Sequence, residues 1–479
     1  ASASSVLNGS ISVGAGYSSG SLNLYRFDQV GAIAHNMTLT GDAALRLGPG
    51  SEFDGDVNFI SPQIYLNGCI YRGTASIEKS GATNDAGIGG NEFHGITTIT
   101  NSGSGYLMTG NGSRDQFFDA TTFSNTGSYR IYFAYNHDGQ TTTFASDLTI
   151  NTNKSGGTDQ YPYMIAENNA SSISIGGNLT INNGGTIRSD YRFLNGTGST
   201  MTVSGTTIIN ITNTDASTLV NMGQNGSSIY NGNITVSNTG GAAGITFNNT
   251  ASATSILNGS ISIGAGFSSG SLNLYRFDQV GAIAHNLTLT GDAALRVGPN
   301  SEFDGNVNFI SPQIYLNGCI YQGTATIEKN GATNDGGTGG NTFTGITTIT
   351  NSGSGFLYTG NGSKDTFLAP TTFNNTGGSR IYVANNHSGE TTTFASTVIF
   401  NSNKTSGSDA WSYLIADGSN TGISFGSDVI INCAGTIQSN HRILNGGGST
   451  AAYNGTVTIN VTNTHPSTTI AMGENGTST

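Results

Sequence analysis

The chain has 479 residues, of which 71 are glycine, and only 35% are apolar and 9% charged. Ordinary globular domains contain roughly 45–50% apolar and 25% charged residues. The composition therefore argues against a thick hydrophobic core, and the low charge argues against charge-driven disorder. The 16 Lys and Arg are scattered singly among 28 Asp and Glu, for a formal net charge of −12, which excludes nucleic-acid binding by phosphate neutralisation. No apolar stretch approaches the roughly 18–20 residues of a membrane span.

A long internal repeat organises the sequence. The segment GSLNLYRFDQVGAIAHN at 20–36 recurs unchanged at 270–286, an offset of 250 that holds without insertion or deletion. Identity is 62 of 70 positions between 1–70 and 251–320, and 14 of 29 between 201–229 and 451–479. We interpret 1–250 as one repeat unit and 251–479 as a second, incomplete unit continuous with the first. We expect the chain to be an excerpt of a longer array.

A shorter, irregular period runs inside each unit. Segments such as FHGITTITN (93–101) and IGGNLTINN (175–183) share an apolar anchor within a short alternating run. Successive anchors lie 24, 27, 31, 28, 27, 27, 26, 20, 18 and 22 residues apart, which predicts ten coils in each 250-residue unit. The anchors are Ile99, Phe123, Ile150, Ile181, Ile209, Val236, Ile263, Leu289, Phe309, Ile327 and Ile349.

The alternating runs predict short strands and almost no helix. Apolar and polar residues alternate with period two, are rich in β-branched types and are bounded by Gly, Asn and Ser, which is typical of half-buried strands. Similar segments in an open-ended array predict an all-β fold, a β-solenoid (parallel β-helix), in which each coil stacks its apolar positions on the coil below. We expect Asn and Gly to occupy corners with left-handed backbone, and stacked Asn side chains to hydrogen-bond along the axis.

Cysteine and histidine indicate neither disulfides nor a metal centre. Cys69 and Cys319 are the same position one unit apart, and Cys433 corresponds to Asn183, so we expect three unpaired interior thiols. The seven histidines show no HxxH or HExxH spacing and no CxxC pair is present, so we predict surface or corner histidines and no metal site. No dinucleotide or Walker motif indicates a cofactor.

Three patterns in the sequence are candidates for catalytic residues. Glu52, Asp54 and Asp56 would share one face of a strand and could ligate calcium or act on a glycan, but the second copy has Asn306 in place of Asp56, which favours a solvated strand face. GYSSG at 16–20 and GFSSG at 266–270 match the G-x-S-x-G elbow, but the SLNLY that follows alternates like a strand, not a helix. We interpret both as turns.

Arginine and carboxylate positions give the best remaining candidate for a glycan-active site. Arg26, Asp28 and Arg46 recur at the same offset in the second unit, and a cross-coil cluster of three such groups in a groove would favour an enzyme. An ion pair between neighbouring coils is the simpler and the favoured account. We therefore predict no catalytic residues.

Aromatic residues in the longer, variable coils are the candidates for surface contact. Exposed rings there could stack on a sugar or another surface, and the alternative is partial burial beneath a loop or in the core. The two copies diverge most in these coils, which suits a surface that varies over a constant scaffold. The candidates are Tyr132, Tyr135, Tyr161, Tyr163 and Trp411.

The segments GITTITNSGSGYLMTGNGS (95–113) and TTTFASDLTINTN (141–153) resemble the repeat regions of giant surface adhesins of Bacteroidota, including gliding-motility adhesins that use type IX secretion. Less closely, they are similar to filamentous haemagglutinin-like β-helices. The resemblance spans essentially the whole chain and implies an extracellular, cell-surface filament. It implies further copies of the repeat as partners along the chain, and contact with polysaccharide, cells or abiotic surfaces. It carries over no functional residues, because its motif is structural.

Our first hypothesis is therefore a non-enzymatic, adhesive β-solenoid segment of a surface filament that makes many weak, repeated contacts. The alternatives are a carbohydrate-active β-helix enzyme, a lyase or hydrolase, and a purely structural sheath fibril.

Overall fold

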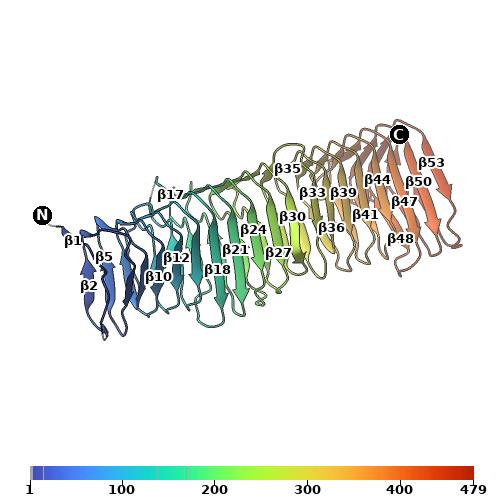
Figure 1. Cartoon of the computed structure of the whole chain (residues 1–479). Coiled ribbons are helices and arrows are strands. Elements are labelled where there is room, and N and C mark those ends of the chain that lie inside the picture. The colour runs from blue at the N-terminus through green and yellow to red at the C-terminus, as the bar shows by residue number, and fades with distance from the viewer. Residues whose placement is uncertain (1–3, 15, 138, 169) are drawn as a thin grey trace. The chain divides into compact units, whose positions relative to one another are not determined.

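The computed structural model describes residues 4–14, 16–137, 139–168 and 170–479. These residues form strands, turns and loops, and none of them is helical. The chain divides into two compact units, Ala1–Asn258 and Gly259–Thr479, and the division falls eight residues after the sequence boundary at 250/251. Each unit is a β-solenoid whose coils contribute strands in turn to three parallel sheets, which confirms the predicted fold class (Figure 1).

In the first unit, each coil runs from the first sheet through the second to the third. The first-sheet strands are β1 (Ser5–Leu7), β3 (Phe27–Gln29), β6 (Ser51–Phe53), β9 (Cys69–Tyr71), β11 (Glu92–Phe93), β14 (Gln116–Phe117), β17 (Thr141–Phe144), β20 (Ser172–Ile175), β23 (Thr200–Val203), β26 (Ser227–Tyr230) and β29 (Ser255–Leu257). The second-sheet strands are β4 (His35–Thr38), β7 (Val57–Ser61), β10 (Ala75–Lys79), β12 (Thr97–Asn101), β15 (Thr121–Asn125), β18 (Leu148–Lys154), β21 (Leu179–Gly185), β24 (Thr207–Ile211) and β27 (Ile234–Asn238). The third-sheet strands are β2 (Ser21–Leu24), β5 (Ala44–Leu47), β8 (Gln63–Leu66), β13 (Leu107–Met108), β16 (Ile131–Phe133), β19 (Tyr163–Ile165), β22 (Tyr191–Phe193), β25 (Leu219–Asn221) and β28 (Gly244–Phe247).

The second unit repeats this order. Its first-sheet strands are β32 (Phe277–Gln279), β35 (Ser301–Phe303), β38 (Cys319–Tyr321), β40 (Thr342–Phe343), β43 (Thr366–Phe367), β46 (Thr391–Phe394), β49 (Gly422–Phe425), β52 (Thr450–Tyr453) and β55 (Thr477–Ser478). Its second-sheet strands are β30 (Ile261–Phe267), β33 (His285–Thr288), β36 (Val307–Ser311), β39 (Ala325–Lys329), β41 (Thr347–Asn351), β44 (Thr371–Asn375), β47 (Val398–Lys404), β50 (Val429–Gly435) and β53 (Val457–Val461). Its third-sheet strands are β31 (Ser271–Leu274), β34 (Ala294–Val297), β37 (Gln313–Leu316), β42 (Leu357–Asn361), β45 (Ile381–Asn385), β48 (Trp411–Ile415), β51 (Asn440–Ile443) and β54 (Ile470–Met472).

The register of the second sheet follows most of the predicted anchors. Ile99 pairs with Phe123, Phe123 with Ile150, and Ile150 with Ile181. In the second unit, however, Leu287 rather than Leu289 pairs with Phe309. The predicted anchor at Leu289 was therefore wrong by one alternation, because both leucines are buried and sequence spacing alone does not separate them.

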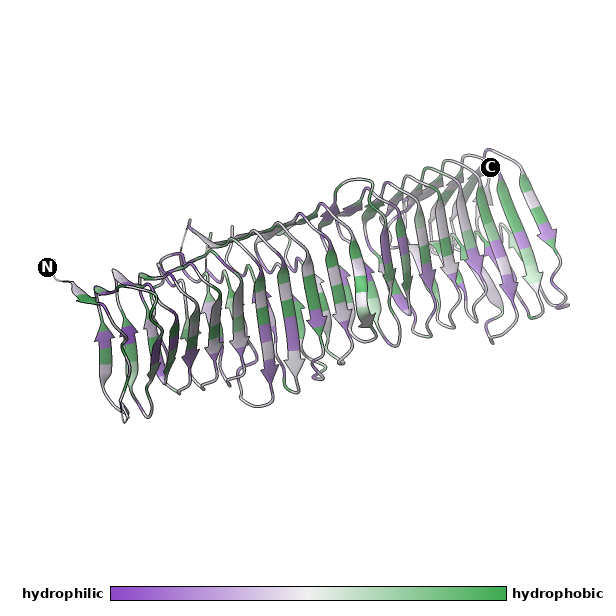
Figure 2. Cartoon of the chain, in the orientation of Figure 1, coloured by the Kyte–Doolittle hydropathy of each residue, from purple (hydrophilic) through white to green (hydrophobic). Residues whose placement is uncertain are grey.

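Alternation along the strands gives each coil a thin interior. The second-sheet strands bury every other residue, as in β12, where Thr97, Ile99 and Asn101 point inward, and hydrophobic and hydrophilic residues alternate along the strands (Figure 2). On the outer face, Asn182 donates to Asn151 (2.8 Å) and Asn210 donates to Asn182 (3.1 Å). These Asn ladders confirm the expected hydrogen bonding along the axis.

An aromatic stack runs along the inside of the first sheet. In the first unit Phe53, Tyr71, Phe93, Phe117 and Phe144 lie with ring centroids 5.6, 4.7, 4.8 and 4.7 Å apart and interplanar angles of 3–8°. The stack occurs because in-register parallel pairing places equivalent rings one strand spacing apart, about 4.7–4.9 Å. The second unit has the equivalent stack through Phe303, Tyr321, Phe343, Phe367, Phe394, Phe425 and Tyr453.

The corner between the third and first sheets departs from the expectation that Asn and Gly take the left-handed positions. Ala134, Ala166 and Leu194 have φ of 50°, 52° and 56°. A non-glycine residue in this region costs roughly 1–2 kcal/mol. All three side chains are fully buried, so the packing of the methyl and isobutyl groups offsets the backbone cost.

Four of the five lysines end second-sheet strands and are fully buried: Lys79, Lys154, Lys329 and Lys404. Burial lowers the pKa of each ammonium. Each Nζ donates to a backbone carbonyl of the turn that follows, at 2.5–2.7 Å, with acceptors in Gly81, Asp159, Gly331 and Asp409. These lysines therefore hold the corner between the second and third sheets.

The aromatic stack predicts a strong contrast between two adjacent residues. Phe117 is buried in the stack, whereas the side chain of Phe118 points outward and is 45% exposed. We expect Phe117→Ala to lower the free energy of unfolding by about 3–5 kcal/mol, and Phe118→Ala to change it by about 0.5 kcal/mol or less. Denaturant titrations of both variants test this, and similar losses in the two would contradict the stack as a source of stability.

Candidate functional site

Outward residues of the third sheet form an aromatic and arginine surface in the first unit. The register aligns Met108, the last residue of β13, with Tyr132 of β16, then Met164 of β19 and Arg192 of β22. The two methionines are buried, and Tyr132 and Arg192 are half-buried. Residues just before these strands widen the surface. We name the set Tyr106, Tyr129, Arg130, Tyr132, Tyr135, Tyr161 and Arg192 the aromatic–arginine surface.

The tyrosine rings of this surface contact one another. The ring centroid of Tyr132 lies 5.5 Å from that of Tyr106 and 4.8 Å from that of Tyr135, both edge to face, and Tyr106 lies 6.1 Å from Tyr129. Burial raises the pKa of Tyr132 and Tyr106, so the rings stay neutral at ordinary pH. They present half-exposed apolar faces with hydroxyl groups at their edges.

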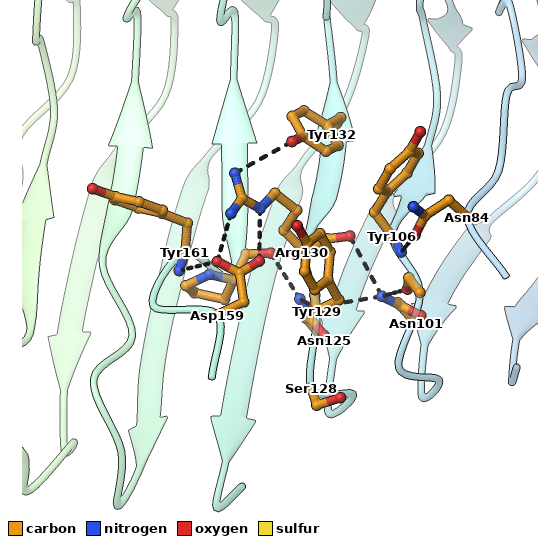
Figure 3. Close-up of polar contacts among 12 residues, drawn as sticks. Asn84, Asn101, Tyr106, Asn125, Ser128, Tyr129, Arg130, Tyr132, Asp159 and Tyr161 are labelled. Carbon is orange, nitrogen blue, oxygen red and sulfur yellow. Dashed lines mark hydrogen bonds and ion pairs between the residues drawn. The ribbon is translucent and has the colours of Figure 1, made fainter. Parts of the chain in front are cut away.

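Arg130 organises the cluster (Figure 3). Its Nε and Nη2 donate to the two carboxylate oxygens of Asp159, each at 2.6 Å. The guanidinium carbon lies 5.1, 5.7 and 5.4 Å from the ring centroids of Tyr129, Tyr132 and Tyr161. Burial is the largest single influence and lowers the pKa of Arg130, but the hydrogen bonding to Asp159 and the charge interactions with Tyr132, Asp159 and Tyr129 together outweigh it and raise the pKa. The arginine therefore stays cationic and holds three rings.

Two further hydrogen bonds fix the position of Asp159. Its Oδ1 also accepts from the backbone N–H of Tyr161 (3.1 Å), and its backbone carbonyl accepts from buried Lys154 (2.7 Å). The Asp159 side chain is only 4% exposed. The solenoid corner thus positions the ion pair, and the ion pair positions the rings.

The second unit builds the same kind of surface from different residues. Arg380 binds both carboxylate oxygens of Asp409 at 2.7 Å, and the rings of Tyr358 and Tyr382 stack with centroids 4.5 Å apart. At the position of Tyr161 stands Trp411, with the guanidinium of Arg442 at 4.3 Å from its ring. The ion pair and the aromatic character are kept, while individual rings change.

Four of the five predicted contact residues lie on these surfaces. Tyr132, Tyr135, Tyr161 and Trp411 are half-buried at the outer side of the third sheet. The prediction for Tyr163 was wrong: its ring is fully buried and its hydroxyl donates to the carbonyl of Asn151 at 2.6 Å. Tyr161 and Tyr163 would share a face in one strand, but β19 begins only at Tyr163, after Pro162, so the alternation does not extend back to Tyr161.

Sequence reasoning missed the residues that complete the surface, namely Tyr106, Tyr129 and Arg130 in the first unit and Tyr358 and Tyr382 in the second. A signal for them existed. Arg130 and Asp159 recur together as Arg380 and Asp409 at the 250-residue offset, although the sequence around them diverges.

Two carboxylates of the acidic triplet Glu52, Asp54 and Asp56 accept backbone hydrogen bonds at the corners between coils. β6 ends at Phe53, so of the three only Glu52 lies in a strand, and the expected shared strand face was wrong. Asp54 accepts the backbone N–H of Gly31 (2.9 Å), and Asp56 accepts that of Thr74 (2.8 Å). Asn306 accepts the equivalent N–H in the second unit at 2.8 Å. The exchange of Asp for Asn is tolerated because only a side-chain oxygen acceptor is needed.

The residues considered for glycan chemistry lie on two sheets. Asp28 is on β3 of the first sheet, where it pairs in register with Glu52. Arg46 is on β5 of the third sheet, with its guanidinium 4.9 Å from the ring centroid of Tyr65. The GYSSG segment leads directly into strand β2, as expected for a turn.

The thiols and histidines lie mostly in the interior. Cys69, Cys319 and Cys433 are unpaired and buried, as predicted, and burial raises the pKa of Cys69 to about 12. The prediction of surface or corner histidines was wrong for His35, His285 and His441, which are buried in strands. His137 and His387 are also buried, but they lie in the connections between the third and first sheets, as corner residues. Within the described part of the chain, no group of three His, Cys, Asp or Glu is placed to hold a metal ion.

Comparisons with known proteins add no relative. No family model, no curated protein and no solved structure matches the chain. In the described ranges no helix is long and apolar enough to cross a membrane.

The buried ion pair and the exposed ion pair should differ in how much stability the protein loses when the arginine is replaced. Arg130 and Asp159 are 17% and 4% exposed, whereas Arg72, paired with Glu52, is 50% exposed. We expect Arg130→Met to lower the free energy of unfolding by about 3 kcal/mol, because it leaves a buried carboxylate uncompensated. Arg72→Met should cost about 1 kcal/mol or less. Denaturant titrations test this, and equal costs for the two would contradict the role given to Arg130.

His441 predicts a pH dependence with a matched control inside the chain. Burial lowers its pKa to about 3, against about 6.5 in an unfolded chain. Its contribution to stability is therefore complete above about pH 6.5 and is lost as the pH falls toward 3. The first unit has Tyr191 at the same position, fully buried. We compare the melting temperature of His441→Tyr with that of the unchanged chain. We expect this difference to favour His441→Tyr more at pH 4.5 than at pH 7.5. A difference in melting temperature that is constant with pH would contradict this.

Proposed function

We propose that the chain is a segment of an extracellular filament on a cell surface, a stiff β-solenoid that adheres through many weak, repeated contacts. The observation that carries the proposal is the aromatic–arginine surface, which is built on the same sheet in both units at corresponding coils. Further copies of the repeat would be its partners along the chain, and polysaccharide or another cell or abiotic surface would be its target.

The packing supports a mechanical role. Backbone pairing along the axis, the inner aromatic stack and the outer Asn ladder all join each coil to the next within a unit. Bending a unit would break many of these interactions together, so it should resist bending. A stiff support keeps repeated contacts at fixed spacing, and avidity then rises with each contact that engages at the same time.

The exposed chemistry supports adhesion to hydrated surfaces. Half-buried tyrosine and tryptophan rings lose little side-chain entropy on contact and combine an apolar face with a polar edge. Arginines clamped by buried carboxylates add donors without free net charge. Such a surface suits weak contact with sugars or with wet interfaces.

Adhesion should depend on these rings more than on other exposed rings. We expect Tyr106→Ser/Tyr132→Ser/Tyr161→Ser to lower retention on polysaccharide-coated and bare silica surfaces at least several-fold, measured by quartz crystal microbalance with washing. Tyr25→Ser, at a ring that is 51% exposed elsewhere in the first unit, should leave retention unchanged. Circular dichroism checks that the triple variant folds. Equal retention of the triple variant and the unchanged chain would favour a purely structural fibril.

A further inference from the structure

A shallow hollow opens beside Tyr161 on the third-sheet side of the first unit. It has a volume of about 190 Å³ and is lined by side chains from neighbouring coils. We name it the Tyr161 hollow, after the ring that borders it. Its polar lining comes from Arg188, Asp190, Arg192, Asn221, Gln224 and Asn249.

Around the hollow, the hydrogen-bond donors lie nearer the surface than the acceptors. Arg188 pairs with Asp190 at 2.7 Å, and the side chains are 46% and 8% exposed. Arg192 pairs with Glu167 at 3.2 Å, and these are 23% and 13% exposed. In both pairs the guanidinium is the more open partner and the carboxylate the more buried one. The hollow therefore offers N–H donors at its surface, with acceptors behind them.

Part of this polar set lacks a partner within the chain. The Nε of Arg192 and the Oε2 of Glu167 are buried and make no hydrogen bond. Asn221 donates to the Oε1 of Gln224 at 3.0 Å, which leaves the Gln224 amide nitrogen for a ligand. The Gln224 amide lines the hollow, so it can donate to a hydroxyl group of a molecule bound there.

The charge balance identifies the class of ligand. Arg188 is paired with Asp190 in the lining, and Arg192 is paired with Glu167, which lies outside it. The two pairs together are formally neutral, and an anion would have to compete with Asp190 and Glu167 for the arginines. A sugar hydroxyl both donates and accepts, as the mixed lining requires. The Tyr161 ring borders the hollow and is half-buried, with the guanidinium carbons of Arg130 and Arg192 5.4 and 5.1 Å from its centroid. The exposed part of the ring offers an apolar surface for the C–H face of a pyranose. We propose that the Tyr161 hollow binds one uncharged pyranose unit of a polysaccharide. This inference rests on the proposed adhesive function and gives it a ligand class and a site.

The second unit supplies a natural set of substitutions for the test. At the corresponding positions it has Gln438 for Arg188, Asn440 for Asp190 and Trp411 for Tyr161. The double variant Arg188→Gln/Asp190→Asn therefore introduces a pair that the same fold accommodates, and it removes the charged hydrogen bonds of the hollow without adding net charge. Tyr25→Ala serves as a control, because it removes an exposed ring outside both the hollow and the aromatic–arginine surface.

Isothermal titration calorimetry of the full chain tests the proposal. The probes are neutral gluco-, galacto- and manno-oligosaccharides, with oligogalacturonate as the acidic comparison. We expect at least one neutral oligosaccharide to bind at one site per chain, with affinity reduced at least tenfold in Arg188→Gln/Asp190→Asn and in Tyr161→Ala. Tyr25→Ala should bind like the unchanged chain.

The outcomes separate this inference from the function on which it rests. Binding of oligogalacturonate alone, no binding of any neutral probe, or unchanged affinity in Arg188→Gln/Asp190→Asn would overturn the inference. If the chain still adheres in the microbalance assay in any of these cases, the adhesive function stands and only the ligand site is wrong. If the unchanged chain also fails to adhere, both are wrong.

Discussion

In-register parallel pairing between successive coils is the constraint on which the rest of this structure depends. It places each side chain directly over its equivalent in the previous coil, so the sequence of one coil restricts the next. Phe93 stacks on Tyr71 and Phe117 on Phe93 for this reason, and Asn182 reaches Asn151 for the same reason. A small fraction of apolar residues then suffices, because each ring has neighbours of its own kind above and below.

The same constraint leaves the corners free to vary. The coils differ in length because residues are added between strands, where pairing does not hold them, and the aromatic–arginine surface is built beside these longer connections. Arg130 is fixed by Asp159, which Lys154 and the backbone of Tyr161 hold in turn. Variable contact residues thus stand on a support that the interior keeps constant, and the second unit shows the result with Arg380, Asp409 and a different set of rings.

The sequence predicts the positions of residues well where the alternation of apolar and polar residues repeats. It predicts them poorly where the alternation stops. Ile99, Phe123 and Ile150 could be aligned in advance because each lies centrally in a short alternating run. Leu287 and Leu289 could not be distinguished, since both satisfy the same pattern. Tyr163 was assigned to the surface because its neighbourhood is variable, although the strand that buries it begins only there. The arginine and carboxylate partners of the site were harder still, because Arg130 and Asp159 lie 29 residues apart and meet only through the length of one coil.

The buried lysines have a consequence for the chemistry that the folded chain offers to its surroundings. Lys79, Lys154, Lys329 and Lys404 are enclosed at the corners, and of the lysine side chains only that of Lys364 is exposed. Amine-directed acylation of the native protein is therefore confined, among lysines, to one position in the second unit. A β-solenoid segment of this kind can be tethered or labelled through a single lysine side chain, and a lysine-specific protease meets one accessible target instead of five.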